Sequence, residues 1–372
     1  MHGKTLALLW VCIPFIAASA AAQTTVNPDI SVIPRFLIQS NDGERLSGGI
    51  REFSRPDFSF QELELVLAAY LNPFARADVV MTLPGPDIEA GKLGLEELYA
   101  TILRGLPLDL NLRLGKYRAD FGRLNIAHPH AWPFITQPLS QERFLGEEGL
   151  NDLGISVSTL LPTGDVYTKL TLELLRGNAV GEAAGIADSS GNSPFYAAAA
   201  RLTGFFSLDD DNDLEAGLSG FTGIHDPYNR DRFWYLGADV KYKYRPDTYT
   251  SLVVQGELLW NFRDALTDAD LTPFLDAAGM PERKSISSGG AYVYADYQFM
   301  KIFSVGARAD WSGTPYSGTT TGTGVSLFAG YYPVEETLGL RMEFQHSDTD
   351  VQVNLIALQI LFSLGPHKAH PF

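Results

Sequence analysis

Apolar and polar residues alternate along most of this chain, and helical periodicity is nearly absent. In residues 108–114 every second position is leucine, and Asp, Asn and Arg occupy the positions between them. The same alternation runs through residues 238–244 and 338–345. Since successive side chains of a β-strand point to opposite faces, each such segment predicts a strand with one apolar and one polar face.

Sixteen segments of this kind are predicted, and most are 10 to 15 residues long. Strands of soluble sheets average about 5 or 6 residues, whereas a tilted strand that crosses a bilayer needs about 9 to 11. The lengths therefore favour an all-β fold, a transmembrane antiparallel β-barrel of 16 strands. The segments are 29–39, 57–71, 75–84, 94–104, 108–118, 152–162, 165–176, 195–208, 212–224, 231–244, 248–262, 286–298, 301–314, 321–332, 336–347 and 350–364.

The predicted connections alternate in length. Tight turns at Pro73, 104–107, 162–165, 209–211, 245–247, Met300 and 333–335 are separated by longer loops at 40–56, 85–93, 119–151, 177–194, 225–230, 263–285 and 315–320. Short turns at one end and long loops at the other are typical of outer-membrane barrels, in which the short turns are periplasmic. An even strand number places both ends of the barrel on that same side.

Charged residues fall on one face of the predicted strands. A charge that faced lipid would cost about 2 to 4 kcal/mol near the midplane, so these side chains are predicted to face a water-filled lumen. The predicted lumen carries 9 basic and 12 acidic residues. They are Arg35, Arg76, Arg113, Lys169, Arg201, Lys241, Lys243, Arg308 and Arg341, with Glu62, Glu64, Asp78, Glu97, Asp109, Glu173, Glu215, Asp239, Glu257, Asp296, Asp310 and Glu343.

Residues 1–22 have the three-part pattern of a secretory signal peptide, with Lys4, an apolar run and a series of small residues. The predicted organisation is a signal peptide, 1–22, followed by a single barrel, 23–372. Cys12 is the only cysteine, so its removal excludes disulfides, thiolate nucleophiles and cysteine metal sites. Removing Lys4 from the 28 basic residues leaves 27 against 44 acidic ones, a formal charge of −17, which argues against a nucleic-acid partner.

Residues 119–151 form the longest predicted connection that is rich in Gly, Pro, His and aromatic residues, and they make up the third loop on the outer side. Loops of this length in compact proteins are usually functional or disordered, and this composition favours an ordered loop that folds into the mouth or lumen of the barrel.

The stretch from Gly115 to Gly122, Gly-Lys-Tyr-Arg-Ala-Asp-Phe-Gly, is similar to a Gly-x-Phe-Lys-x-x-Phe-Gly stretch of the phosphate-selective porin family. Together with Asn125, residues 128–132 and the C-terminal tail 365–372, it also resembles uncharacterised outer-membrane proteins labelled as zinc-regulated receptors. The resemblance to bacterial porins implies a third loop that narrows the channel and assembly as a homotrimer. It also implies that the barrel-assembly machinery recognises Phe372. A phosphate-selective pore implies a basic wall, which the acidic excess does not support.

Four histidines are candidate zinc ligands: His128 and His130 in the long loop, and His367 and His370 in the tail. The predicted topology places the two pairs on opposite sides of the membrane, and neither pair has an evident third ligand. A structural role for His128 and His130, packed around Trp132, is therefore favoured. Metal binding by these two residues is the weaker alternative, and no cofactor is predicted.

The sequence predicts a porin-like channel in a Gram-negative type of outer membrane, surrounded by lipid, for passive diffusion of small hydrophilic solutes or ions. The alternative is a plugged barrel that serves as a surface anchor, docking protein or ligand-binding receptor. An enzyme is not predicted, because sequence-adjacent pairs such as His346 and Asp348 do not make a catalytic constellation. The candidate pore and constriction residues are Glu62, Glu64, Glu97, Arg113, Arg123, Asn125, His128, His130, Trp132, Lys241, Lys243 and Arg308.

Two local features are also predicted. Apolar positions at helical spacing from Leu271 to Ala278 predict a short amphipathic helix in a surface loop. In the last strand the alternation shifts near Leu355, which predicts a β-bulge.

Overall fold

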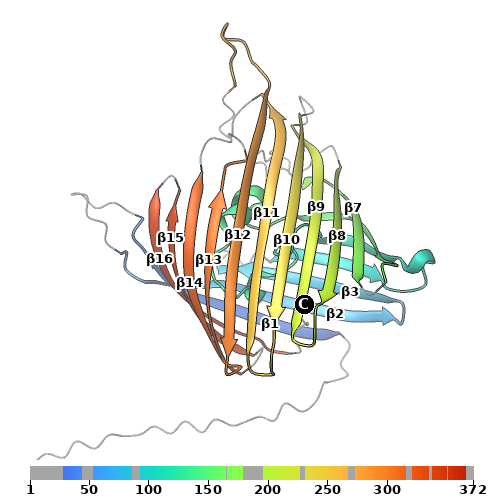
Figure 1. Cartoon of the computed structure of the whole chain (residues 1–372), viewed down its shortest axis with the longest axis vertical. Helices are drawn as coiled ribbons and strands as arrows, with labels where there is room; N and C mark the ends of the chain where they lie inside the picture. Colours follow the sequence, from blue (N-terminus) through green and yellow to red (C-terminus); the bar gives the residue numbers. More distant parts are fainter. Residues whose placement is uncertain are drawn as a thin grey trace, which may run out of the picture.

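The computed structural model describes residues 28–43, 53–85, 93–164, 166–178, 196–226, 231–266, 273–315, 321–334, 337–349 and 351–365. They form a closed antiparallel barrel of sixteen strands, in which sequence neighbours pair and β1 pairs with β16 (Figure 1). The predicted fold class and strand number are confirmed. The signal peptide and nearly all of the C-terminal tail lie outside the described residues.

The strands agree with the predicted segments to within about three residues, the precision expected at element boundaries. They are β1 (Asp29–Asn41), β2 (Asp57–Asn72), β3 (Ala75–Pro84), β4 (Gly94–Ile102), β5 (Asn111–Arg118), β6 (Asn151–Leu161), β7 (Tyr167–Leu175), β8 (Ala197–Ser207), β9 (Asn212–Asp226), β10 (Asp231–Tyr244), β11 (Ser251–Ala265), β12 (Lys284–Phe299), β13 (Phe303–Ser312), β14 (Gly322–Val334), β15 (Leu338–Asp348) and β16 (Gln352–Phe362).

Burial alternates along the strands as the sequence pattern predicts. In β10 the side chains of Trp234 and Leu236 are exposed on the outside of the barrel, while Phe233, Tyr235 and Asp239 are buried inside it. Lumen-side charges on other strands are buried in the same way. The apolar outer face matches a lipid-facing surface, and the charged inner face matches a polar lumen.

Short turns and long loops lie at opposite ends of the barrel. At one end residues 73–74 join β2 to β3 and residues 300–302 join β12 to β13. At the other end residues 119–150 join β5 to β6. The described chain enters β1 and leaves β16 at the end that carries the short turns, as predicted.

Three local predictions were wrong. Asp109 does not lie on a strand, because residues 107–109 form the 3-10 turn η1 (Pro107–Asp109) with a positive φ at Asp109, and the side chain is exposed. In the described part of the predicted helix, residues 273–278 form a turn that a bridge between Leu275 and Pro281 closes. Leu271 lies outside the described residues.

The predicted bulge near Leu355 is also absent, since β16 pairs with β1 and with β15 in a continuous register. Leu355 packs beside Leu37, Ala357 and Ile135, and Ile135 belongs to the long loop. Leu355 therefore faces the lumen because it contacts the long loop there, and the alternation of β16 does not change face at this residue.

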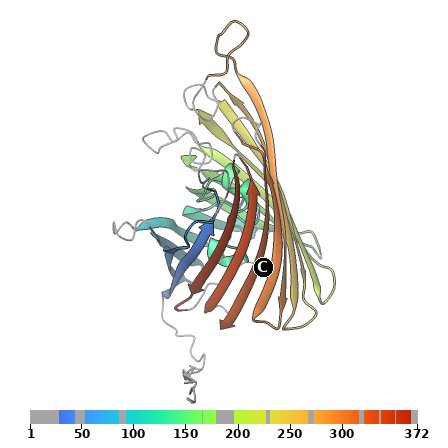
Figure 2. The ribbon, with the colours of Figure 1, turned by 90° about the vertical axis from the view of Figure 1, so that its left-hand side faces the viewer.

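Residues 119–150, here called the inner loop, fold into the barrel (Figure 2). The inner loop contains η2 (Pro129–Ala131) and α2 (Leu139–Leu145), and α2 packs against β12 and β13. Its Phe121, Phe144 and Leu145 are fully buried against wall residues such as Tyr235. The hydrophobic core of the molecule thus lies inside the barrel, between the inner loop and the wall. No helix in the described residues has the length and hydropathy that a membrane span requires.

Candidate functional site

Wall glutamates bind backbone N–H groups of the inner loop. Glu257 on β11 accepts hydrogen bonds from the N–H groups of Arg123 (3.0 Å) and Leu124 (2.5 Å). Four strands further around the wall, Glu343 on β15 accepts from Ile135 (2.5 Å) and Thr136 (2.8 Å). Each glutamate therefore satisfies two consecutive N–H groups that would otherwise be buried without a partner.

Two further glutamates act similarly where the chain enters the lumen. Glu97 on β4 accepts from the N–H of Arg118 (3.1 Å), and Glu173 on β7 accepts from the N–H of Asp120 (2.9 Å). Several acidic side chains of the lumen are therefore engaged in hydrogen bonds with the inner loop. A count of wall charges alone overstates the negative charge that a passing solute meets.

Asp120 joins the start of the inner loop to β7 and β8. Its carboxylate accepts hydrogen bonds from Lys169 (3.0 Å) and Thr171 (2.8 Å) and pairs with Arg201 (3.3 Å), which also forms a bidentate pair with Asp239. Burial raises the pKa of the Asp120 carboxyl, but the Lys169 and Arg201 charges outweigh burial and hold that pKa below its ordinary value.

Asp120→Asn is expected to destabilise the barrel at neutral pH by about 1 to 3 kcal/mol, because charge-assisted hydrogen bonds at a buried site are lost. The depressed folded-state pKa makes this stabilisation fully present above about pH 4 and removes it as the pH falls through the folded-state value. Urea unfolding of wild type and Asp120→Asn in detergent is repeated from neutral to acidic pH. The difference between their free energies of unfolding should decrease as the pH falls. A difference that stays constant down to about pH 2 would contradict this assignment.

Gly122 allows the inner loop to approach the wall closely. Its φ is +63°, and a Cβ placed there would lie 2.4 Å from Oε2 of Glu257. Its N–H donates to Oγ of Ser219 (3.0 Å). A side chain at this position would be strained in conformation and would also displace the Glu257 anchor, which explains the glycine that ends the motif 115–122.

The predicted site residues Arg123 and Asn125 hold the first part of the inner loop in place. Arg123 forms an ion pair with Glu215 on β9. The side chain of Asn125 donates to the carbonyl of Ala119 (2.8 Å) and accepts from the N–H of Leu150 (2.8 Å). Asn125 thus ties together the two ends of the inner loop.

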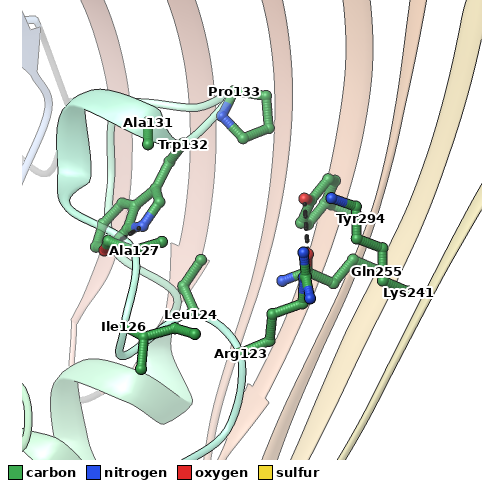
Figure 3. Close-up of a pocket in the computed structure, with 10 residues that line it drawn as sticks. All are labelled: Arg123, Leu124, Ile126, Ala127, Ala131, Trp132, Pro133, Lys241, Gln255 and Tyr294. Atoms are coloured by element: carbon green, nitrogen blue, oxygen red, sulfur yellow. Dashed lines mark hydrogen bonds between the residues drawn. The ribbon is translucent and has the colours of Figure 1, made fainter. Parts of the chain in front are cut away.

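Trp132 lies in an aromatic cluster with Phe134, Tyr292, Tyr294 and Phe328. Its indole N–H donates to the carbonyl of Ala127 (3.1 Å). Figure 3 shows Trp132 and Ala127 on the loop side of a small cavity, with Gln255, Tyr294 and Lys241 on the wall side. The cavity has a volume of about 90 Å³.

The remaining predicted residues are spread around the wall. Arg308 is fully buried above the ring of Phe134. Arg113 lies over the rings of Tyr99 (4.9 Å) and Tyr117 (5.3 Å). Glu62 pairs with Arg35, and Lys243 lies half-buried on β10.

Glu64, Glu97, His128 and His130 come together with Glu96, and these five residues are here called the Glu–His cluster. Nδ1 of His130 lies 3.0 Å from Oε2 of Glu64. Nδ1 of His128 lies 3.6 Å from that same oxygen and 3.5 Å from Oε1 of Glu96, while its Nε2 lies 3.8 Å from Glu97. Burial lowers the pKa of His128, but the nearby carboxylates of Glu64, Glu97 and Glu96 together raise it to about 9.

Sequence reasoning missed Glu96, which strict alternation assigns to the lipid face. A β-bulge opposite Val80 and Met81 inserts Glu96 into β4 as an extra residue, so both Glu96 and Glu97 are buried inside the barrel. The signal is present in the sequence. Leu95 and Leu98 both need a lipid-facing position, and two positions three apart along a strand face the same side only if a bulge lies between them.

Two larger cavities lie on either side of the inner loop. The outer one, about 710 Å³, is reached by Ile135, Thr136 and Gln137 of the loop and by the loop-end parts of β1, β2, β15 and β16. The other, about 540 Å³, is reached by Arg123 and Ile126 of the loop and by the turn-end parts of β7, β8 and β9. The inner loop therefore separates an outer chamber from an inner one.

Comparisons with known proteins support this architecture. No protein-family model matches the chain. Over 347 residues it is 28% identical to an uncharacterized protein of Aquifex aeolicus, and the match covers 85% of this chain and 70% of that protein.

Solved structures of outer-membrane proteins superimpose on most of the chain. The outer-membrane channel DcaP of Acinetobacter baumannii gives a TM-score of 0.57 at 12% identity, covering 91% of this chain and 97% of that chain. The anion-selective porin of Comamonas acidovorans gives 0.57 at 9% identity, covering 91% and 99%. The trimer form of OmpT from Vibrio cholerae gives 0.53 at 10% identity, with coverage of 91% and 99%. The chain has the fold of the outer-membrane porins.

Proposed function

We propose that this porin-fold chain is an outer-membrane channel for passive diffusion of small hydrophilic solutes, with the inner loop as its constriction. The observation that carries the proposal is the inner loop itself, fixed across the lumen between an outer and an inner chamber. Hydrogen bonds that its backbone N–H groups donate to wall glutamates hold it at this depth rather than at the rim. A loop held this way sets the size of the solutes that pass.

The chamber walls support transport of uncharged or weakly charged solutes. Amide side chains line the outer chamber together with charged groups of both signs: Gln39, Gln61, Gln137 and Gln345, with Glu142, Arg143 and Glu147. Both signs of charge line the inner chamber, with Lys169 and Arg201 beside Asp120 and Glu215. Amides and hydroxyls bind hydroxylated solutes without selecting charge, so weak ion selectivity is expected and a phosphate preference is not proposed.

Homotrimeric assembly is proposed as well, supported by the likeness to the trimer form of OmpT. The signal peptide and the recognition of Phe372 by the barrel-assembly machinery remain predictions. They lie outside the described residues.

The contacts of the inner loop also favour a second candidate, a plugged barrel with a docking or receptor role. The inner loop and its entry at Arg118 bind β4, β7, β11 and β15 through backbone N–H groups, and side chains extend the contacts to β2 and β9. Such contacts on all sides leave little free cross-section unless the loop moves.

Single-channel conductance in a planar bilayer distinguishes the two functions. The test compares the full chain with a variant in which a short Gly-Ser linker replaces residues 126–138. Asn125 is retained in that variant because it ties Ala119 to Leu150. The channel proposal expects conduction by wild type and a larger conductance by the variant. A silent wild type with a conducting variant supports the plugged barrel, and two silent proteins overturn the channel proposal.

A further inference from the structure

The Glu–His cluster has the donor atoms and spacing of a metal site. One ligand atom each from Glu64, Glu96 and His128 lies within 4.8 Å of the others. The two distances from His128 Nδ1 to carboxylate oxygens are 3.5 Å and 3.6 Å. Ligand atoms about 2.1 Å from a tetrahedral zinc ion are about 3.4 Å apart, so an ion fits between these atoms with small side-chain movements.

The imidazole of His128 points into this space without a hydrogen bond of its own at Nδ1. That atom is buried and has no hydrogen-bond partner among the described residues. The Glu64 and Glu96 side chains beside it are only 3% and 5% exposed. A buried, unsatisfied nitrogen between two carboxylates is costly unless a proton or a metal ion occupies the gap.

Surrounding groups would orient each of the three ligands. Glu97 lies 3.8 Å from Nε2 of His128, the far side of the ring, in the carboxylate–histidine arrangement that supports metal-binding imidazoles. His130 contacts Glu64 at 3.0 Å, and Arg118 binds Glu96 through Nε at 3.0 Å. The inner loop supplies both histidines, whereas β2 and β4 supply the carboxylates.

The local charge also favours a dication. Four acids, Glu62, Glu64, Glu96 and Glu97, face this part of the lumen with two guanidinium groups, those of Arg35 and Arg118. Metal binding requires a neutral His128, so the ion must displace the proton that the raised pKa otherwise keeps on this ring. With both imidazoles neutral, these acids and guanidinium groups carry two net negative charges, and one divalent cation would balance them. Calcium and magnesium prefer all-oxygen sites, whereas an imidazole ligand favours zinc and related transition metals.

We propose that Glu64, Glu96 and His128 bind a divalent transition-metal ion of the zinc class. The fourth position of the ion is then open to water or to a group on a passing solute. Bound metal would join the middle of the inner loop to β2 and β4, the side of the wall opposite the Glu257 anchor. The site goes beyond the proposed channel and does not depend on conduction.

The test is calorimetric titration of Zn²⁺ into the refolded, chelator-treated full chain, with Co²⁺ absorption spectra as a second readout. Wild type is expected to bind a single Zn²⁺ and to give the visible bands of tetrahedral Co²⁺, with no comparable binding of Ca²⁺. His128→Asn and Glu96→Gln should lose Zn²⁺ binding. Glu97→Gln should weaken the Zn²⁺ affinity about 10- to 100-fold, because Glu97 orients the His128 ring.

His346→Asn is the matched control, since His346 alternates with the buried Gln345 on β15 and contacts Asn354 on β16 instead of the cluster. Heat-modifiable migration on gels confirms that each variant is a folded barrel. Absence of Zn²⁺ binding by folded wild type overturns the proposal. Binding that persists in both His128→Asn and Glu96→Gln overturns it too, because the ion then lies elsewhere.

Discussion

Replacing Arg308 with methionine is expected to destabilise the barrel by about 3 to 5 kcal/mol, because the change leaves a buried acid without its cation. Arg308 is 1% exposed. It donates to Asp310 (2.9 Å) and to the carbonyl (2.6 Å) and hydroxyl (2.9 Å) of Thr136 in the inner loop. Its guanidinium also lies 4.4 Å above the ring of Phe134. One residue therefore joins β13 to the loop backbone and to the aromatic cluster.

The measurement is urea unfolding in detergent micelles, followed by tryptophan fluorescence. Arg76→Met is the control, since Arg76 also pairs with an acid two residues away, Asp78 (3.1 Å), but its side chain is 26% exposed. That change should cost about 1 kcal/mol or less. Replacing Asp310 by leucine together with Arg308→Met should recover part of the loss, because Asp310 no longer stays buried without its cation. The recovery is partial because Glu343, which lies 3.7 Å from Arg308, stays buried. If Arg308→Met and Arg76→Met lower the free energy of unfolding equally, burial does not determine how much the Arg308–Asp310 pair stabilises the barrel.

The barrel could be predicted from the sequence because strand alternation is a local property. A lipid-facing leucine and a lumen-facing charge at adjacent positions define the face of each strand without knowledge of its neighbours. Loop lengths then define the two ends. Most of the predicted lumen charges are buried and others are half-buried, and only Asp109, which lies in a turn, is exposed.

The arrangement inside the lumen could not be predicted in the same way, because it depends on contacts between distant segments. Glu257 and the inner-loop N–H groups that it binds are more than 130 residues apart in sequence. Alternation identifies Glu257 as a lumen residue but does not distinguish an anchor from a selectivity charge. The sequence likewise offered no third ligand beside His128, because Glu64 and Glu96 come from two other strands and Glu96 faces inward only through a bulge.

Replacing both Glu257 and Glu343 with alanine is expected to raise the single-channel conductance at least about twofold, since conductance follows the open cross-section of the pore. The double variant removes the acceptors of four backbone N–H groups, two near the start of the inner loop and two near its middle. Each orphaned buried group costs about 1 to 3 kcal/mol. The inner loop should therefore move away from its position against the wall, while the strand pairing that closes the barrel is unaffected.

Asp264→Ala is the matched control, because it removes an acid from the same strand as Glu257 but from an exposed position that contacts Ser285 instead of the inner loop. Its conductance should equal that of wild type, because this acid is outside the lumen and does not hold the inner loop. If the folded double variant conducts like wild type, the aromatic and arginine contacts are sufficient to hold the inner loop, and the glutamates are not anchors. If wild type is silent and the double variant conducts, the inner loop is a plug, and the two glutamates keep the barrel closed.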